Sequence, residues 1–587
     1  MTQTVAIPWR HRMVARIRRS ENSALLVLSV IIGALAGLGA VAFRWLIENA
    51  TLLFSGHADY SDAGHAAHPW LPWLGPFFIV LAPAVGGLLY GPLVHRFAKE
   101  ARGHGVPEVM YAISKRGGRI PAKVAAVKAV ASAITIGSGG SVGREGPIVQ
   151  IGAAFGSTLA RWVRLNESQV RLLVACGAAG GIAATFNAPI AGVFFALELL
   201  LANFVARTFA PVVLASVTAS IIGRAVLGDE PFLALPEFTV RSVREYALYA
   251  VLGLLAALVA TSFTKVLYWL EDAADKIWRG PEWLRPGVGG LLLGLLLLAI
   301  PQMYGVGYPV LENAVMGKYL IGFLLLLLVA KIIATSLTIA IGGSGGVFAP
   351  SLFLGAALGA AFGQAADAMF PGLGIAPGAY ALVGMGAVFA GASRAPITAV
   401  IILFELTGEY SIILPLLMAV VISTTLANAM SRESIYTAKL TRRGVDLLAR
   451  NPRPELAGLT VSDLMLPAPK PVGTRMSLPE VLKALRASRR PGLPVLTEHG
   501  EYVGVVTAVG AAAAIGDDDA DTVTVSQLIE WRDYVAPDAA VEDVLPVLLS
   551  EEVYDGVPVL DAEGTVVGWL RRDAVLRRVT APKSAPH

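Results

Sequence analysis

The chain has 587 residues, of which 55% are hydrophobic and only 15% are charged, and its formal net charge is +4. This balance is that of an integral membrane protein with an additional polar part. The single cysteine, Cys176, excludes an intrachain disulfide framework, and the scattered basic residues form no patch for a nucleic acid.

Basic residues flank the apolar part of the sequence at both ends. Those before the first apolar segment are Arg10, Arg12, Arg16, Arg18 and Arg19, and those after the last are Arg442, Arg443, Arg450 and Arg453. The positive-inside rule therefore predicts cytoplasmic termini, an even number of crossings and a place in the inner cell membrane. A signal peptide is the rival interpretation, but the apolar run 24–46 is too long for one.

Changes in composition and stretches rich in glycine and proline divide the chain into domains. We expect a basic cytoplasmic N-terminus (1–22), a membrane domain (23–440), a linker (441–457) and two polar domains (458–516 and 523–580). Several apolar segments of the membrane domain are short and broken by glycine or proline. Such broken helices survive in a bilayer only where protein or a water-filled path surrounds them.

The stretch Gly137–Pro147 lies between two apolar runs, 124–136 and 148–159. Its glycines leave backbone N–H groups uncovered, and Pro147 suits the first turn of a helix. A helix N-terminus inside the membrane is a binding site for an anion. Glu145 lies in the same turn, so its carboxylate can take the place of that anion. The stretch therefore predicts a gated anion site.

Two long segments of the membrane domain repeat one another. Residues 128–156 align without gaps with 331–359, and 188–190 match 395–397. The two repeats span about 23–230 and 244–430. Each contains a Gly-rich break before a helix, and such paired breaks are typical of the inverted repeats of transporters. Glycine for helix packing is the alternative interpretation. It does not explain why Lys, Ser and Pro also match.

The polar domains repeat as well. Residues 492–496 and 556–560 share the pattern Gly-x-Pro-Val-Leu, with x Leu in the first and Val in the second, and Ser477 and Glu480 form a capping box that starts a helix. A helix, strand, turn, strand and helix, taken twice, resembles a tandem pair of CBS domains, and the acidic run 517–521 reads as the solvated linker between them. The nucleotide pattern of such domains is incomplete, because Gly510 replaces an aspartate and Arg571 stands near the hydroxyl position. We therefore expect no cofactor and a structural or regulatory role; an adenine nucleotide at the CBS pair is possible, but the motif does not support it.

The sequence Gly143-Arg-Glu-Gly-Pro147 resembles the GREGP motif of the CLC family of chloride channels and proton-coupled chloride antiporters. The second break, 345–350, is similar to the family's GxFxP motif. The resemblance implies an all-α polytopic membrane domain with an inverted repeat, followed by an α+β pair of CBS domains. It also implies that Glu145 is the gate and proton acceptor. The anion-binding positions it implies at the two breaks are Arg144, Glu145, Gly146, Val347 and Phe348.

Two further motifs complete the implied anion path. The segment 102–107 resembles the family's GSGIP motif, with Gly105 in the loop and His104 in place of the usual serine. His104 either donates an N–H to the anion or points away and leaves the backbone to bind it, so the preferred anion stays open. Tyr436 matches the family's inner-gate tyrosine, although a tyrosine at that place is by default an interfacial anchor.

Charged residues within apolar segments mark ion paths or paired sites. The resemblance implies that Lys128 and Arg144 supply positive potential to the pore. A salt bridge from Lys128 to Glu145 or Glu198, or a packed ion pair of Arg144, is the alternative. Glu198 is the candidate for an inner proton path, because Leu199 occupies the place where the antiporters carry a second glutamate.

The sequence thus predicts transport of chloride or a similar small anion through a glutamate-gated path. A voltage- or pH-gated channel is the first interpretation and a proton-coupled antiporter is the alternative. A CBS-regulated cation transporter is more distant, because the motifs offer N–H donors and cations rather than carboxylates. An enzyme lacks a nucleophile with a base partner.

The implied partners are a small anion, protons, the lipid bilayer and a second copy of the chain, since similar proteins are homodimers with one path per subunit. We expect no bound metal. The histidines and aspartates between residues 57 and 68 have conceivable ligand chemistry, but nothing in the sequence fixes a tetrahedral set.

Overall fold

The computed structural model describes residues 21–202, 204–228, 242–445, 456, 458–514, 524–548 and 555–580. Residues 1–447 and 448–587 form two compact units, here called the membrane unit and the C-terminal unit. The N-terminal arginines, Arg450, Arg453, most of the predicted linker and the acidic run 517–521 lie outside the described residues. The predictions made for them stay predictions.

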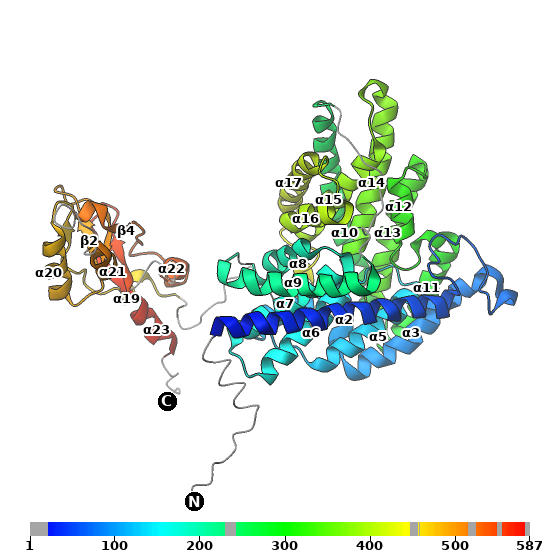
Figure 1. Ribbon diagram of the computed structural model, residues 1–587, viewed down its shortest axis with the longest axis horizontal. Helices are drawn as coiled ribbons and strands as arrows, with labels where there is room; N and C mark the ends of the chain where they lie inside the picture. Colours follow the sequence, from blue (N-terminus) through cyan, green and yellow to red (C-terminus); the bar gives the residue numbers. More distant parts are fainter. Residues whose placement is uncertain are drawn as a thin grey trace, which may run out of the picture. The chain divides into compact units, whose positions relative to one another are not determined.

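The membrane unit contains the same order of helices twice (Figure 1). The first set is α2 (Glu21–Ser55), η1 (Pro72–Phe77), α3 (Phe78–Phe97), η2 (Lys99–Ala101), α4 (Val106–Lys115), α5 (Ala122–Gly137), α6 (Glu145–Trp162), α7 (Glu167–Phe186), α8 (Pro189–Phe195), η3 (Ala196–Leu201) and α9 (Ala206–Leu227). The second set is α10 (Glu245–Ile277), α11 (Arg285–Ala299), η4 (Pro301–Met303), α12 (Tyr308–Val315), α13 (Ile321–Ala340), α14 (Phe348–Met369), η5 (Pro371–Leu373), α15 (Pro377–Ser393), α16 (Pro396–Thr407) and α17 (Ile413–Met430). The short helix α18 (Thr437–Thr441) follows them.

The two sets pack in the same way, which confirms the internal repeat. Figure 1 shows α2 lying along α7 and α9, and α10 contacts α15 and α17 in the same manner. Matched polar residues link the sets. The backbone N–H of Ser141 donates to Thr338 Oγ1 at 3.1 Å, and the N–H of Ser344 donates to Thr135 Oγ1 at 3.3 Å. Helix packing by glycine alone does not account for this exchange.

Among the described residues, eight helices are long and apolar enough to cross a membrane. They begin with Ser23–Ser55 and end with Ile413–Met430, and shorter apolar helices such as Pro189–Leu201 and Pro396–Thr407 lie between them. Helices α7 and α14 form the interior, since 83% of the apolar window of each is buried, against 39% for α2. Helix α14, which begins at the second Gly-rich break, is thus enclosed by protein, as a break inside a bilayer requires.

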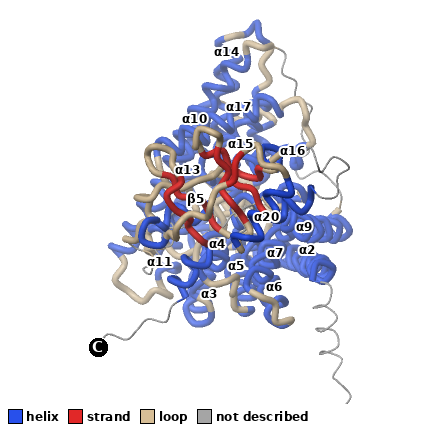
Figure 2. Tube along the Cα trace, turned by 90° about the vertical axis from the view of Figure 1, so that its left-hand side faces the viewer, coloured by secondary structure: helices blue, strands red, loops and turns tan. Residues whose placement is uncertain are grey.

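The C-terminal unit carries the strands, which Figure 2 colours red. Its elements are α19 (Val461–Leu464), β1 (Val472–Gly473), α20 (Leu478–Ser488), β2 (Gly492–Leu496), β3 (Tyr502–Thr507), α21 (Ala508–Ala513), η7 (Val525–Gln527), β4 (Ile529–Trp531), α22 (Val541–Leu548), β5 (Gly556–Leu560), β6 (Val566–Arg571) and α23 (Arg572–Thr580). One sheet has the order β1-β2-β3-β4, with β1 and β2 parallel, and β5 pairs antiparallel with β6. The predicted order of helix, strand, strand and helix is confirmed in both copies.

Candidate anion site

The two Gly-rich breaks meet backbone to backbone. The N–H of Gly143 donates to Gly346 O at 2.8 Å, and the N–H of Gly346 donates to Gly143 O at 2.6 Å. Helix α6 begins two residues after the first of these glycines, and α14 begins two residues after the second. Both helix N-termini therefore start from one point in the interior, as the repeat predicts.

A third loop, which carries His104, closes around the same point. The N–H of Gly103 donates to Gly343 O at 3.1 Å, and the N–H of Gly345 donates to Gly103 O at 3.3 Å. A Cβ on Gly146 would lie 1.8 Å from the carbonyl oxygen of His104, so no larger residue fits there. This close approach of three backbones explains the glycines of all three motifs.

The side chain of Glu145 is 1% exposed and lies between these helix ends. Its Oε1 accepts a hydrogen bond from the Tyr308 hydroxyl at 2.7 Å, and its Oε2 is 3.4 Å from the backbone N of Ala349 in the first turn of α14. A helix N-terminus attracts negative charge. The carboxylate thus occupies a place that suits an anion.

The other predicted residues of the two breaks are buried beside it. Val347 occupies the N-cap position of α14, and the ring of Phe348 packs against Phe186 and Phe389 with centroid distances of 5.2 and 4.2 Å. Tyr436 is 1% exposed and immediately precedes α18. A tyrosine so deeply buried is not an interfacial anchor.

The imidazole of His104 is 2% exposed, and neither ring nitrogen has a hydrogen-bond partner among the described residues. Its ring centroid lies 6.1 Å from that of Tyr268. A buried polar group without a partner is unfavourable unless a ligand or water satisfies it. That His104 donates an N–H to the anion stays a prediction.

Two buried lysines brace the loops. Lys128 Nζ donates to the carbonyl oxygens of Ala101 at 2.9 Å and Gly103 at 2.7 Å, whereas Lys331 Nζ donates to Ser141 Oγ at 2.9 Å and Val306 O at 3.0 Å. The alternative of a salt bridge from Lys128 to Glu145 or Glu198 is not what the structure shows. The two lysines, matched in sequence, hold equivalent loops in the two repeats.

Arg144 borders a basic hollow next to Tyr308, whose hydroxyl donates to Glu145. The hollow has a volume of about 320 Å³ and also receives Arg44, Arg224 and Tyr308. The guanidinium of Arg144 lies 5.2 Å from the centroid of the Tyr308 ring, and its Nη2 is 3.4 Å from the carbonyl oxygen of Thr185. The positive charge at this entrance attracts anions.

The carboxylate of Glu198 caps a helix of the other repeat. It accepts from the N–H groups of Ile397 at 3.1 Å and Thr398 at 2.8 Å, and from the Thr398 hydroxyl at 2.6 Å. In the equivalent place Glu405 accepts from the N–H groups of Ile190 and Ala191 at 2.9 and 2.6 Å. Sequence reasoning singled out Glu198 but missed this exchange of caps. A proton path through Glu198 stays a prediction.

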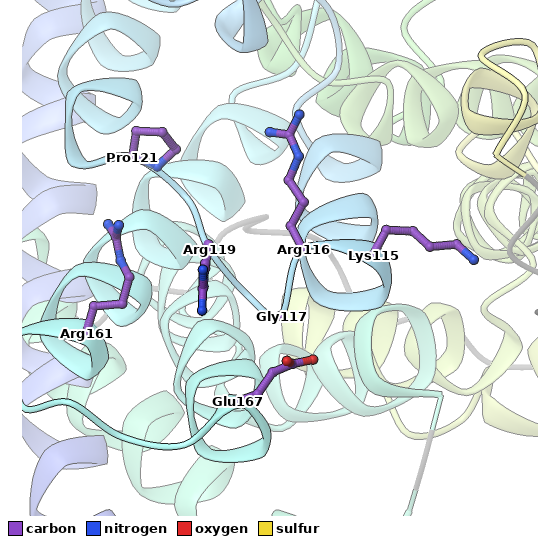
Figure 3. Close-up of a pocket in the computed structure, with 7 residues that line it drawn as sticks. All are labelled: Lys115, Arg116, Gly117, Arg119, Pro121, Arg161 and Glu167. Atoms are coloured by element: carbon purple, nitrogen blue, oxygen red, sulfur yellow. The ribbon is translucent and has the colours of Figure 1, made fainter. Parts of the chain in front are cut away.

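A larger basic pocket of about 520 Å³ lies where α4 and α6 end and α5 and α7 begin (Figure 3). Its basic residues are Lys115, Arg116, Arg119 and Arg161. Figure 3 shows Arg161 and Lys115 on opposite sides, with Glu167 below Arg119. None of the predicted site residues lines this pocket, so it is separate from the candidate anion site.

Tyr308 is the residue of this site that sequence reasoning missed. A signal existed, because Gly305-Val-Gly-Tyr-Pro309 has the Gly-x-Gly-x-Pro spacing of residues 103–107. The offset between these two segments is 202 residues, whereas that of the Gly-rich breaks is 203. A gapless alignment therefore ends before it reaches them.

Metal and nucleotide sites gain no support from the described residues. They contain no group of three or more His, Cys, Asp or Glu side chains that could hold a metal ion. In the C-terminal unit the Thr507 hydroxyl donates to Glu530 at 2.6 Å. Arg571 pairs with Asp555 and Asp573 at 3.2 and 3.0 Å.

Comparison with known proteins identifies this architecture. The family model of voltage-gated chloride channels matches residues 86–428, and that of CBS domains matches 461–515 and 526–581. The chain belongs to the CLC family. Its members are transport proteins rather than enzymes, so the prediction that the chain is no enzyme is confirmed.

Relatives of the CLC family match over most of their length. The chain is 35% identical to a protein of Ralstonia nicotianae whose name places it with ClcB-like chloride channel proteins, over 73% of this chain and 99% of that protein. It is 36% identical to the H(+)/Cl(-) exchange transporter ClcA of Vibrio cholerae, over 71% of this chain and 89% of that protein.

Solved CLC structures share the fold. A slow cyanobacterial Cl-/H+ antiporter has 26% identity and a TM-score of 0.64, and the match covers 71% of this chain and 97% of that one. A eukaryotic CLC transporter matches 94% of this chain and 97% of its own with a TM-score of 0.61, and at 22% identity it supports the fold alone. The predicted fold class is thus confirmed, and the chain is a multi-pass membrane protein of anion transport.

Proposed function

We propose that the protein exchanges chloride, or a similar small anion, for protons. The observation that carries the proposal is the place of Glu145, whose carboxylate lies at the N-terminus of α14 with Oε2 3.4 Å from Ala349 N. The same position attracts an anion and holds a group that can bind a proton. Relatives named as H(+)/Cl(-) exchangers support this alternative over the channel that was our first interpretation.

The exchange follows from competition for one site. Ionised Glu145 blocks the path by filling the amide cradle, and a protonated side chain has no charge to hold it there. The side chain then leaves and carries its proton, and an anion takes its place. The binding groups at this stage are the backbone at Arg144, Gly146, Val347 and Phe348, with His104, Gly105 and Tyr436 on the remaining path. Lys128 and Arg144 contribute positive potential, and Glu198 is the candidate inner proton relay.

Reconstituted protein in liposomes tests the proposal. A pH gradient across the membrane drives anions against their own gradient if the protein is an antiporter. Anion movement that follows only the anion gradient, at every pH, would instead establish a channel. Leu199, at the position where the family's antiporters carry a glutamate, is the observation that keeps the channel as the second candidate.

Orientation and assembly extend the proposal. Cytoplasmic termini in the inner membrane are supported by basic residues at one set of helix ends, including the pocket of Figure 3. We also infer a homodimer, as the resemblance to the CLC family implies, with one path per subunit, because Glu145, Phe348 and Tyr436 all come from one chain. Cross-linking in native membranes tests the dimer, and a monomer that transports would contradict it.

The C-terminal unit serves as a structural or regulatory clamp that binds no nucleotide. This is supported by the bond from Thr507 to Glu530 and the ion pairs of Arg571, which occupy the groups that would otherwise meet a ribose or phosphate. A saturable isotherm for ATP or AMP with the full-length protein would contradict it.

A further inference from the structure

The segment Gly305–Pro309 is the repeat counterpart of the loop Gly103–Pro107. Both have the pattern Gly-x-Gly-x-Pro, and both precede a short helix, α12 and α4. The backbone agrees as well, since φ is +77° and +83° at Gly103 and Gly105 and +63° and +85° at Gly305 and Gly307. Two loops of one shape therefore approach the anion site from the two repeats.

The lysines confirm that the loops are equivalent. Lys128 donates to Gly103 O at 2.7 Å, and Lys331, its counterpart, donates to Gly305 O at 3.4 Å and Val306 O at 3.0 Å. Both lysines are fully buried. Each loop is thus fixed by a cation from its own repeat, which makes the position of its side chains well defined.

The loops differ in the residue before the proline. The first loop has Val106 there, whose side chain cannot donate a hydrogen bond, and the second has Tyr308. The Tyr308 hydroxyl donates to Glu145 Oε1 at 2.7 Å, while Arg144 lies over the face of the Tyr308 ring. The second loop therefore provides a hydroxyl group that donates a hydrogen bond to the carboxylate of Glu145.

We propose that Tyr308 is a positioning residue that holds the ionised Glu145 side chain in the anion path and thereby sets the pH at which the path opens. The inference rests on the proposed gating role of Glu145. A phenol donates more strongly to a carboxylate than to a neutral carboxylic acid. The bond therefore favours the closed, ionised state and weakens when a proton arrives.

Other groups act on the same carboxylate. The charged and titratable groups that face Glu145 are Arg144 in its own turn, Lys331 from α13, Tyr308 from α12 and Tyr436 before α18. The ammonium group of Lys331 donates its hydrogen bonds to Ser141 Oγ and to backbone carbonyl oxygens. Among the described residues, Tyr436 forms no hydrogen bond with Glu145. Tyr308 is thus the side chain whose hydrogen bond to Glu145 the structure shows.

Chloride flux from liposomes as a function of pH tests the inference. Tyr308→Phe removes the donor and keeps the ring, so we expect the midpoint pH of opening to rise by about one unit, a tenfold change in proton affinity. Tyr304→Phe is the matched control, because that buried hydroxyl donates to the Gly137 carbonyl and not to the gate. Difluorotyrosine at position 308, a stronger donor of nearly the same shape, should move the midpoint in the opposite direction.

A Glu145→Ala background separates this inference from the function on which it rests. If Glu145→Ala removes the pH dependence and Tyr308→Phe then has no further effect, Tyr308 acts through the gate. An unchanged midpoint in both Tyr308 variants overturns the inference, as does a shift that persists in the Glu145→Ala background. If Glu145→Ala itself keeps the wild-type pH dependence, the proposed gating function is wrong.

Discussion

Gly143 and Gly346 donate a backbone hydrogen bond to each other, at 2.8 and 2.6 Å, although they are far apart in the sequence. This small antiparallel bridge fixes the distance between the N-termini of α6 and α14. The carboxylate of Glu145 lies at this place, with Oε2 3.4 Å from Ala349 N. In the proposed exchange, the bridge is the structural basis of a site that one guest occupies at a time.

Replacing Gly146 by alanine should disrupt the site. The added Cβ would lie 1.8 Å from His104 O and 3.0 Å from the Cα of Gly346, and backbone atoms on both sides cannot move away. We expect a loss of stability on the order of 3 kcal/mol or more and loss of flux. Thermal unfolding in detergent measures the first and liposome flux the second.

The matched control for this change is Gly322→Ala in α13. A Cβ at Gly322 meets no atom within 4 Å, so its effect on stability should stay within about 1 kcal/mol. Equal effects of the two substitutions would show that the three loops are not packed as closely as described.

His104 should influence which anion is preferred. Its ring is buried without a hydrogen-bond partner among the described residues, so an anion in the path can accept its N–H. His104→Ser should change the ratio of chloride to nitrate flux by about fivefold to tenfold, the worth of one such hydrogen bond. Unchanged selectivity and pH response would mean that only the backbone of this loop binds the anion.

The exchanged caps of Glu198 and Glu405 offer a matched pair of variants. Each carboxylate accepts from two backbone N–H groups at the start of a helix of the other repeat. Either change to glutamine should reduce stability by about 1 kcal/mol, because a charge is lost at a helix N-terminus. Thermal unfolding of both variants measures this.

The same pair tests the proton path. If Glu198 also relays protons, Glu198→Gln reduces the number of protons moved per anion, and Glu405→Gln does not. Equal coupling in the two variants would leave Glu198 as a cap alone.

The capping box of α20 predicts a pH dependence in the C-terminal unit. The pKa of Glu480 is lowered because its carboxylate accepts from the backbone N–H and the hydroxyl of Ser477. A lowered pKa in the folded state means that the cap stabilises above the unfolded value of about 4.3 and is lost as the pH falls through the folded value. Hydrogen exchange at the start of α20 should therefore differ between wild type and Glu480→Gln at neutral pH and agree in acid.

The sequence predicts those parts of the site that are formed by residues matched between the two repeats. Thr135 and Thr338, and Ser141 and Ser344, align without gaps, and the structure shows each threonine accepting from the serine of the other repeat. Local signals also suffice for the capping box of Ser477 and Glu480. The partners of Lys128 could not be read in this way, because they are backbone carbonyls, which any residue provides.

Tyr308 shows where a sequence pattern stops. The Gly-x-Gly-x-Pro spacing marks its loop as the counterpart of residues 103–107, but its contact with Glu145 joins two segments far apart in the chain and cannot be read from that spacing. The pairing of Glu198 with the N-terminus of α16 is of the same kind. In both cases the tertiary fold decides which group the side chain contacts. The residue type alone is therefore compatible with several roles.

Chloride binding to the purified protein, measured by calorimetry across the pH range, tests the competition between Glu145 and an anion most directly. The account predicts that wild-type affinity falls as the pH rises and Glu145 ionises, whereas Glu145→Gln binds chloride equally well at every pH. Identical pH profiles for the two proteins would contradict it, because the carboxylate and the anion would then not share one site.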